Sequence, residues 1–156
     1  MKKTILTAIA ALMVSASALA AGPAPDGQVV TRAGTNPSVS VPKANFTGQA
    51  RMETLFKAQG KFTAYGASVT FEPGARTHWH IHPNGQVLIV TAGVGYTQEW
   101  GKAVQTIYPG DVVWCPPGIK HWHGATAATA MSHTAISQVG DPVVWLEEVG
   151  DTSYPK

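Results

Sequence analysis

The 156-residue sequence is poor in charge and in cysteine. Charged residues make up 13% of the chain and hydrophobic residues 44%, a balance typical of a globular domain rather than a disordered chain. No cluster of lysine and arginine gives it the electrostatic footprint of a nucleic-acid-binding protein. The single cysteine, Cys115, excludes an intrachain disulfide, so the fold must rest on apolar burial. We therefore expect a small-molecule partner rather than nucleic acid or membrane.

The sequence also lacks an apolar stripe of 3.6-residue period long enough for a substantial helix. Its length suits one domain. From Ala67 onward, short runs rich in β-branched and aromatic residues alternate with Gly and Pro turn signals, which predicts an all-β sandwich or jelly-roll barrel. We expect strands over 67–72, 77–82, 86–91, 95–99, 103–108, 111–115, 121–124, 129–137 and 143–148. A strand over 46–52 and a short helical turn over 53–59 are expected to precede them.

The N-terminus has the features of a secretory signal peptide. Two lysines at positions 2 and 3 precede an apolar run over 5–12, and Ala18-Leu19-Ala20 is a small-x-small cleavage pattern. An uncleaved anchor is disfavoured because the run is shorter than the roughly 20 residues of a spanning helix. We expect a signal peptide over 1–20, export to the periplasm and no membrane attachment after cleavage.

Past the expected cleavage site the composition changes. Residues 21–43 are rich in Pro, Gly, Ser and Thr without periodicity, and we expect a flexible leader there, followed by one barrel domain over 44–156. Cleavage removes two lysines and no acid from 11 basic and 9 acidic side chains, leaving 9 of each sign. The net charge of +2 therefore belongs to the signal peptide.

Five of the six histidines lie in two alternating runs, His78-Trp79-His80-Ile81-His82 and His121-Trp122-His123. A strand sends residues i and i+2 to the same face, so each run directs its imidazoles to one place. Imidazole is the commonest protein ligand of divalent transition metals, and a side-chain amide oxygen is a weaker fourth ligand. Histidines that alternate by chance would not explain the ordered glycines and prolines around both runs. We predict a metal site formed by His80, His82, Gln86 and His121.

Two further histidines are expected near the metal. His133 lies on a predicted strand with Met131 and Ala135 on the same face, and we predict that it is the general base. A hydrogen-bonded core histidine is the alternative for this residue. His123 shares a face with His121, and we expect it to line the substrate pocket or to support a ligand. Trp79 and Trp122 face the opposite side of their strands, as packing or subunit-contact residues.

The stretch from Gly74 to Gly93 and the stretch from Gly110 to His121 resemble the paired motifs of the cupin superfamily. More specifically, the chain from about Phe46 to Tyr154 is similar to small single-domain cupins that include manganese-dependent hydroxynitrile lyases. The resemblance implies a cupin double-stranded β-helix, a jelly-roll barrel. It also implies the four ligands named above and His133 as base. The implied cofactor is one divalent metal per chain, manganese first, with iron, nickel, cobalt or zinc as alternatives.

The family reaction is the reversible cleavage of a cyanohydrin such as mandelonitrile to an aldehyde and hydrogen cyanide. Cupins commonly have Glu at the place of Gln86, and a neutral amide leaves the ion its full +2 charge and makes it a stronger Lewis acid. This favours polarising a substrate oxygen or binding an anion such as cyanide, and it does not exclude oxygen chemistry. A lyase is our first expectation, and the alternatives are a dioxygenase or other oxidoreductase and a non-catalytic periplasmic binder. We also expect a homodimer or homotetramer.

Overall fold

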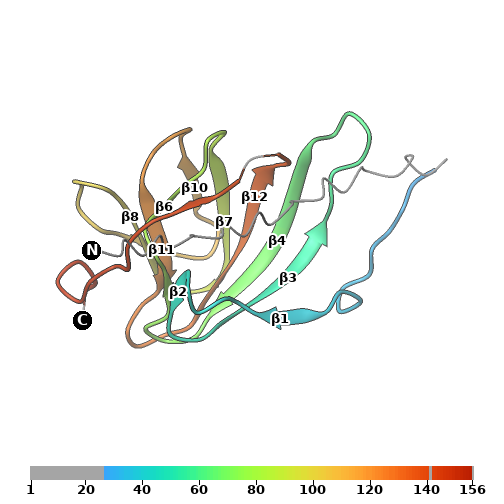
Figure 1. The fold of residues 1–156 in the computed structure, drawn as a ribbon. Coiled ribbons are helices and arrows are strands. Elements are labelled where there is room, and N and C mark those ends of the chain that lie inside the picture. The colour runs from blue at the N-terminus through green and yellow to red at the C-terminus, as the bar shows by residue number, and fades with distance from the viewer. Residues whose placement is uncertain (1–26, 141, 156) are drawn as a thin grey trace, which may run out of the picture.

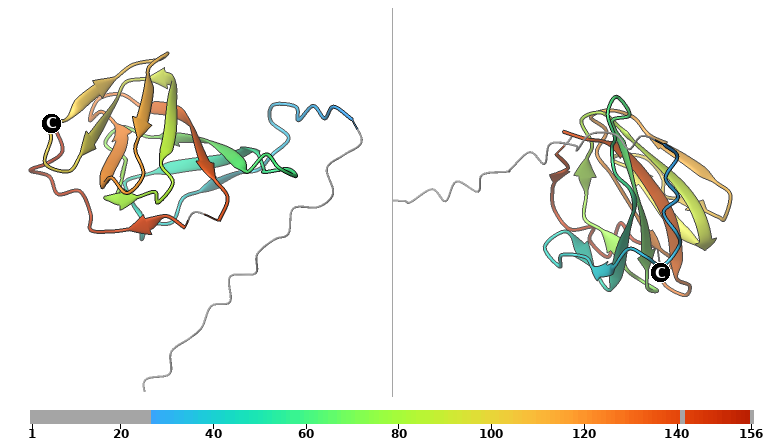
Figure 2. Two further views of the ribbon diagram at one scale, coloured as in Figure 1. Left: turned by 90° about the horizontal axis from the view of Figure 1, so that it is seen from above. Right: turned by 90° about the vertical axis from the view of Figure 1, so that its right-hand side faces the viewer.

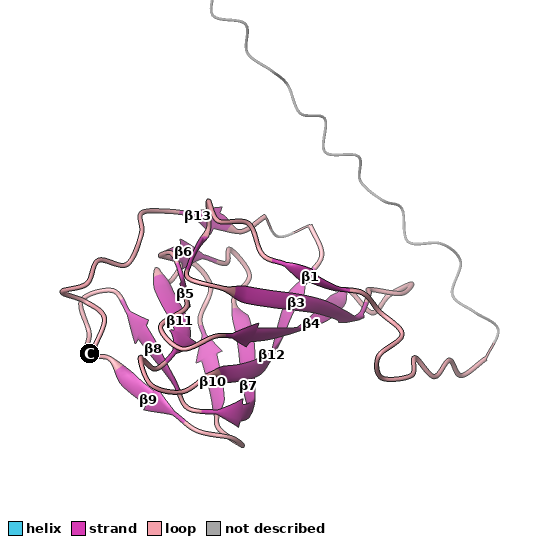
Figure 3. Cartoon of the chain, turned by 90° about the horizontal axis from the view of Figure 1, so that it is seen from below, coloured by secondary structure: helices cyan, strands magenta, loops and turns pink. Residues whose placement is uncertain are grey.

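The computed structural model describes residues 27–140 and 142–155, and within these ranges the chain forms strands and turns but no helix (Figure 3). No helix of the described residues is long and apolar enough to cross a membrane. The all-β prediction is therefore confirmed. The signal peptide predicted over 1–20 lies outside the described residues.

Two antiparallel sheets make up the barrel, and Figure 1 shows them curling toward each other. Sheet A has the strand order β1-β3-β4-β12-β7-β10. Its strands are β1 (Ser38–Ser40), β3 (Ala50–Phe56), β4 (Ala64–Phe71), β12 (Met131–Gln138), β7 (Gln86–Gly93) and β10 (Val112–Cys115).

Sheet B is built around β11 (His121–Ala125), which pairs with β8 (Gly95–Glu99) and with β5 (Arg76–Thr77) and β6 (His80–Ile81). The remaining strands extend these pairs: β2 (Phe46–Thr47) joins β5, β13 (Val144–Trp145) joins β6, and β9 (Gln105–Ile107) joins β8. This is the predicted jelly-roll arrangement.

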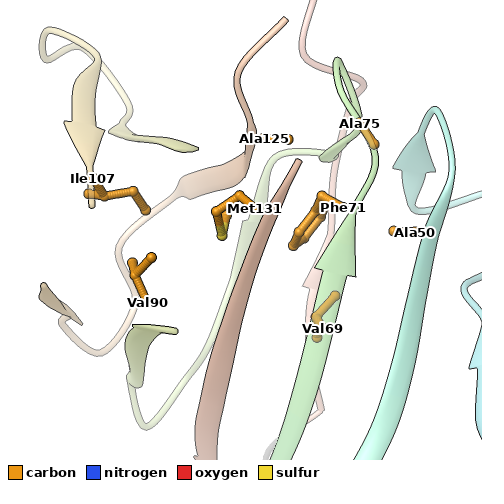
Figure 4. Packing of buried hydrophobic residues seen from close by; sticks show 8 residues of the cluster. All are labelled: Ala50, Val69, Phe71, Ala75, Val90, Ile107, Ala125 and Met131. Carbon is orange, nitrogen blue, oxygen red and sulfur yellow. The ribbon is translucent and has the colours of Figure 1, made fainter. Parts of the chain in front are cut away.

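Alternation along the strands separates the inside of the barrel from its outer faces. On β7, Leu88 and Val90 are buried, whereas Val87 and Ile89 between them are half-buried and face outward. One end of the interior is apolar, as Figure 4 shows. Its buried members are Ala50, Val69, Phe71, Ala75, Val90, Ile107, Ala125 and Met131.

The outer face of sheet B is covered by residues 146–155, which we call the C-terminal tail. Trp79 and Trp122 form a second buried cluster with Val149 and Tyr154 of this tail. Arg76 fixes the tail: its guanidinium donates to the carbonyl oxygen of Val149 and lies 4.5 Å from the centre of the Tyr154 ring. The two tryptophans are thus packing residues under the chain's own tail.

Three expectations about local structure are corrected. The helical turn predicted over 53–59 is wrong, because β3 runs through Phe56 and its residues pair with β4, and this pairing outweighs a weak local preference. The strand expected over 77–82 is interrupted at His78 and Trp79 between β5 and β6. Within the leader predicted over 21–43, Ser38–Ser40 forms β1 and pairs with β3. Figure 2 shows the blue segment before β1 leading away from the barrel.

Candidate metal centre

Three histidines converge on one place in the barrel interior. His80 on β6 is the direct cross-strand partner of His121 on β11, and His82 follows immediately after β6. Their candidate ligand nitrogens all lie within 4.8 Å of one another, and each side chain is at most 3% exposed. This group can hold a metal ion.

Two of the three rings are oriented by backbone carbonyls. Nδ1 of His80 lies 2.9 Å from the carbonyl oxygen of His78, and Nδ1 of His121 lies 2.9 Å from that of Ile119. A carbonyl oxygen only accepts, so each Nδ1 carries the proton and each Nε2 keeps a lone pair for a ligand bond. Burial lowers the pKa of both rings, so they are neutral at pH 7. The donor set therefore fits a divalent transition metal.

Gln86, the predicted fourth ligand, lies in the same cluster. It is the first residue of β7, and its Oε1 is 3.4 Å from Nε2 of His121. The preceding residue, Gly85, has a φ of 82° and lies under Trp114, where a Cβ atom would come within 2.7 Å of the indole. The turn before Gln86 thus requires glycine, and this tight turn determines where β7 begins and therefore where the side-chain amide of Gln86 lies.

His123 and His133 form a hydrogen-bonded pair beside the three histidines. Nε2 of His133 lies 3.1 Å from Nδ1 of His123, whose ring centre is 5.3 Å from that of His80. Burial lowers the pKa of His133 to about 4 and that of His123 well below its usual value. Nδ1 of His133 is buried and has no hydrogen-bond partner among the described residues. Buried polar atoms nearly always have one, so a bound molecule or a water is expected there.

His78, the first histidine of the alternating run, contributes to the site through its backbone. Its N–H donates to the carbonyl oxygen of Asn45, and its own carbonyl accepts from His80. Any residue except proline could supply these groups, so no side-chain pattern could have indicated this role.

Sequence reasoning also missed an aromatic wall formed by Phe46 and Trp145. Trp145 on β13 is the cross-strand partner of His80, with ring centres 4.9 Å apart, and Phe46 lies 5.5 Å from Trp145. Trp145 stays half-buried although it shares the inner face with His80, so solvent reaches this side of the site. The tryptophan comes from a strand 64 residues after β6, and only the pairing of β13 with β6 reveals its place.

A jelly-roll barrel with three clustered imidazoles and an amide inside it defines a protein built to hold a small ligand or a metal. Residues 67–137 match the family model described as "Cupin domain". The chain belongs to the cupin family. The predicted family and fold are thereby confirmed.

Related proteins agree with this assignment. The chain is 54% identical over 127 residues to an (R)-mandelonitrile lyase of Granulicella tundricola, covering 80% of this chain and 97% of that protein. A cupin-like protein of Thermotoga maritima is 39% identical with a TM-score of 0.70, covering 81% and 95% of the two chains. A polyketide cyclase of Streptomyces resistomycificus, 13% identical with a TM-score of 0.68 over 82% and 91%, shares the fold alone.

Proposed function

We propose that this chain is a metal-dependent lyase that reversibly cleaves a cyanohydrin such as mandelonitrile to an aldehyde and hydrogen cyanide. The 54% identity to a protein named (R)-mandelonitrile lyase supports this reaction. The observation that carries it is the buried His123–His133 pair beside three histidines able to hold a metal. A metal alone would fit many reactions, whereas a neutral base next to it suits removal of a hydroxyl proton.

The metal is held in this proposal by His80, His82, Gln86 and His121, and we propose manganese. Iron, nickel, cobalt and zinc accept the same donors. All four ligands are neutral, so the bound ion keeps its +2 charge and supplies Lewis-acid polarisation of a substrate oxygen.

His133 is the base. When its Nε2–H donates to Nδ1 of His123, Nδ1 of His133 is left as an acceptor. The cyanohydrin hydroxyl proton passes to this Nδ1, the bond to the nitrile carbon breaks, and its electron pair leaves with cyanide as the carbonyl forms. Because burial lowers the pKa of His133, the imidazolium readily returns its proton to cyanide, which gives hydrogen cyanide.

The aromatic wall binds the rest of the substrate. Phe46 and Trp145 present ring faces and edges beside His80, and an aryl group packs on such rings better than a short alkyl group does. We therefore propose aryl cyanohydrins as the preferred substrates.

The first test is cyanide release from mandelonitrile by the purified protein, loaded with manganese or stripped with a chelator. Release that disappears on stripping supports the proposal, and no release from the loaded protein contradicts it. His133→Ala should lower turnover by about 10²–10⁴-fold with unchanged metal content, as expected for loss of a general base. His121→Ala should instead lower the metal content itself. Full turnover by the His133 variant would exclude its role as base.

An oxidoreductase is the second candidate, because three imidazoles with open positions also suit iron and oxygen chemistry. Oxygen consumption with a catechol or a diketone separates it from the lyase, which needs no oxygen. Tight ligand binding without turnover in either assay would indicate a non-catalytic binder. We propose a periplasmic location for each of these functions, and the N-terminal residue of the protein in a periplasmic extract tests the predicted cleavage after Ala20.

A further inference from the structure

The two ligand histidines that pair across sheet B, His80 and His121, share one local arrangement. In both cases Nδ1 of the ring is hydrogen-bonded to the backbone carbonyl oxygen two residues earlier in the chain. The residue between that carbonyl and the ligand is Trp79 in the first segment and Lys120 in the second. A shift of Trp79 or Lys120 therefore also moves the carbonyl that orients a ligand ring.

Backbone pairing alone connects these two segments only weakly. Strand β6 has two residues, and it pairs with β11 through the single residue pair His80 and His121. The centres of the two imidazole rings are nevertheless only 4.3 Å apart. A ladder this short contributes few hydrogen bonds and opens easily, so further contacts are needed to keep the two rings at this spacing.

The side chain of Lys120 supplies such contacts on the outer face of sheet B. Its Nζ lies 3.4 Å from the centre of the Trp100 ring and 5.3 Å from the centre of the Trp79 ring. The same ammonium donates a hydrogen bond to Oε1 of Glu147, and the side chain of Lys120 is 21% exposed. An ammonium group is attracted to the face of an indole, and more strongly when it is partly shielded from water. We call Lys120, Trp79, Trp100 and Glu147 the Lys120 cluster.

Backbone hydrogen bonds join the Lys120 cluster to the same two segments. The carbonyl oxygen of Lys120 accepts from the N–H of Trp100 at 2.9 Å, and the N–H of Trp79 donates to the carbonyl oxygen of Glu147 at 3.0 Å. The rings of Trp79 and Trp100 pack edge to face with their centres 4.9 Å apart. The segment before one ligand is thus connected to the segment before the other through side chains and backbone together.

We propose that Lys120 is a positioning residue of the metal centre, which acts from the outer face of sheet B by fixing the spacing and orientation of His80 and His121. This inference rests on the metal centre of the proposed function but not on the lyase reaction. Charge does not explain such a role, because an ammonium next to a ligand repels a divalent cation. Removal of the charge alone would strengthen metal binding, whereas loss of the positioning contacts weakens it. The sign of the change therefore separates the two effects.

Titration of chelator-stripped protein with Co²⁺, followed by visible absorption, tests the proposal. We expect Lys120→Met to raise the dissociation constant for Co²⁺ by about 10–100-fold, the usual effect of losing a group that supports a metal ligand. Lys120→Arg keeps a cation that stacks on tryptophan, and its dissociation constant should stay within about threefold of the wild-type value. Unchanged or tighter Co²⁺ binding by Lys120→Met would overturn the proposal.

Lys102→Met is the matched control for the loss of a positive charge. Nζ of Lys102 lies 2.9 Å from a carboxylate oxygen of Glu99, and Glu99 is the cross-strand partner of His121 on the side of β8. The control thus removes the same charge near the same ligand and leaves the Lys120 cluster intact. We expect its Co²⁺ binding to be unchanged or tighter. Equal weakening in Lys102→Met and Lys120→Met would overturn the proposal.

A second measurement uses metal-free protein, because the lost contacts of Lys120 also lower stability. The exchange of the Nδ1 proton of His121 with solvent, followed by NMR, reports the hydrogen bond that orients this ring. We expect faster exchange in Lys120→Met than in Met131→Ala, which destabilises the opposite end of the barrel. Equal exchange rates would show a merely structural role and overturn the proposal. A wild-type protein that binds no Co²⁺ would contradict the metal centre, and the exchange rates would then decide the role of Lys120 by themselves.

Discussion

The two ends of the barrel interior use the same strands for different purposes. Along β12, Met131 lies in the apolar cluster and His133, two residues later, faces the metal centre. Along β11 the order is reversed, from His121 and His123 to Ala125. The apolar end stabilises the fold by burial, whereas the histidine end buries imidazoles that water would solvate better. The residues that stabilise the fold and the residues suited to chemistry thus lie at opposite ends of the barrel interior. A substitution at one end should have a limited effect on the other.

The largest expected effect is at the apolar end. Met131→Ala removes a side chain that is 1% exposed and should lower the free energy of unfolding by about 2–5 kcal/mol, because a cavity remains where the thioether packed. Urea unfolding measures the loss. Metal content per folded chain should stay at the wild-type level, and a parallel loss of metal would show that the two ends are not separable.

Acid should act on the histidine end. His133 has its pKa lowered by burial to about 4 in the folded protein, against about 6.5 in an unfolded chain. The unfolded state then binds the extra proton, so this contribution to stability is present above pH 6.5 and is lost as the pH falls toward 4. For His133 alone the loss approaches about 3 kcal/mol.

Urea unfolding of chelator-stripped protein between pH 7.5 and 4.5 measures this effect. His133→Leu should flatten the pH dependence, since the variant has one buried imidazole fewer to protonate. A stability that does not change over this range would contradict the assignment of a neutral, buried ring.

The smallest expected effect lies between the two ends, at Thr77. Its hydroxyl accepts a hydrogen bond from the backbone N–H of His123, and both residues are buried. Thr77→Val keeps the shape but leaves that N–H without its acceptor, which should destabilise the fold by about 1–2 kcal/mol. Thr77→Ser retains the hydroxyl but removes a buried methyl group, so the wild-type protein is the reference for Thr77→Val. An unfolding free energy of Thr77→Val equal to that of the wild type would show that the hydrogen bond contributes nothing.

Sequence patterns predicted the histidine end better than its surroundings. The H-x-H spacing and the turn before His121 place His80, His82 and His121 on inward-facing positions, because strand alternation is a local property. The aromatic wall depends on the pairing of β13 with β6, and the hydrogen bond between His123 and His133 joins β11 to β12. Such relations join residues far apart in the chain, and local periodicity does not contain them.

The interruption of the predicted strand at His78 is another example of what local sequence patterns do not predict. Alternation put His78 on the same face as His80, but the chain leaves the strand there to bond with Asn45 and with the C-terminal tail through Trp79. The helical turn expected over 53–59 failed for a related reason, since Glu53 pairs with Ser68 of a neighbouring strand. Tertiary hydrogen bonds decided both cases.

The backbone carbonyls of His78 and Ile119 hold two rings of the candidate metal centre in a fixed orientation. Each lies two residues before the ring it orients, so His80 and His121 are held by short segments of their own chain rather than by a bound ion. An incoming ion meets rings that have already lost their rotational freedom, and its departure leaves the strands in place. We therefore expect the site to accept one divalent metal in place of another at constant fold, with the supply of metals around the protein deciding which one binds.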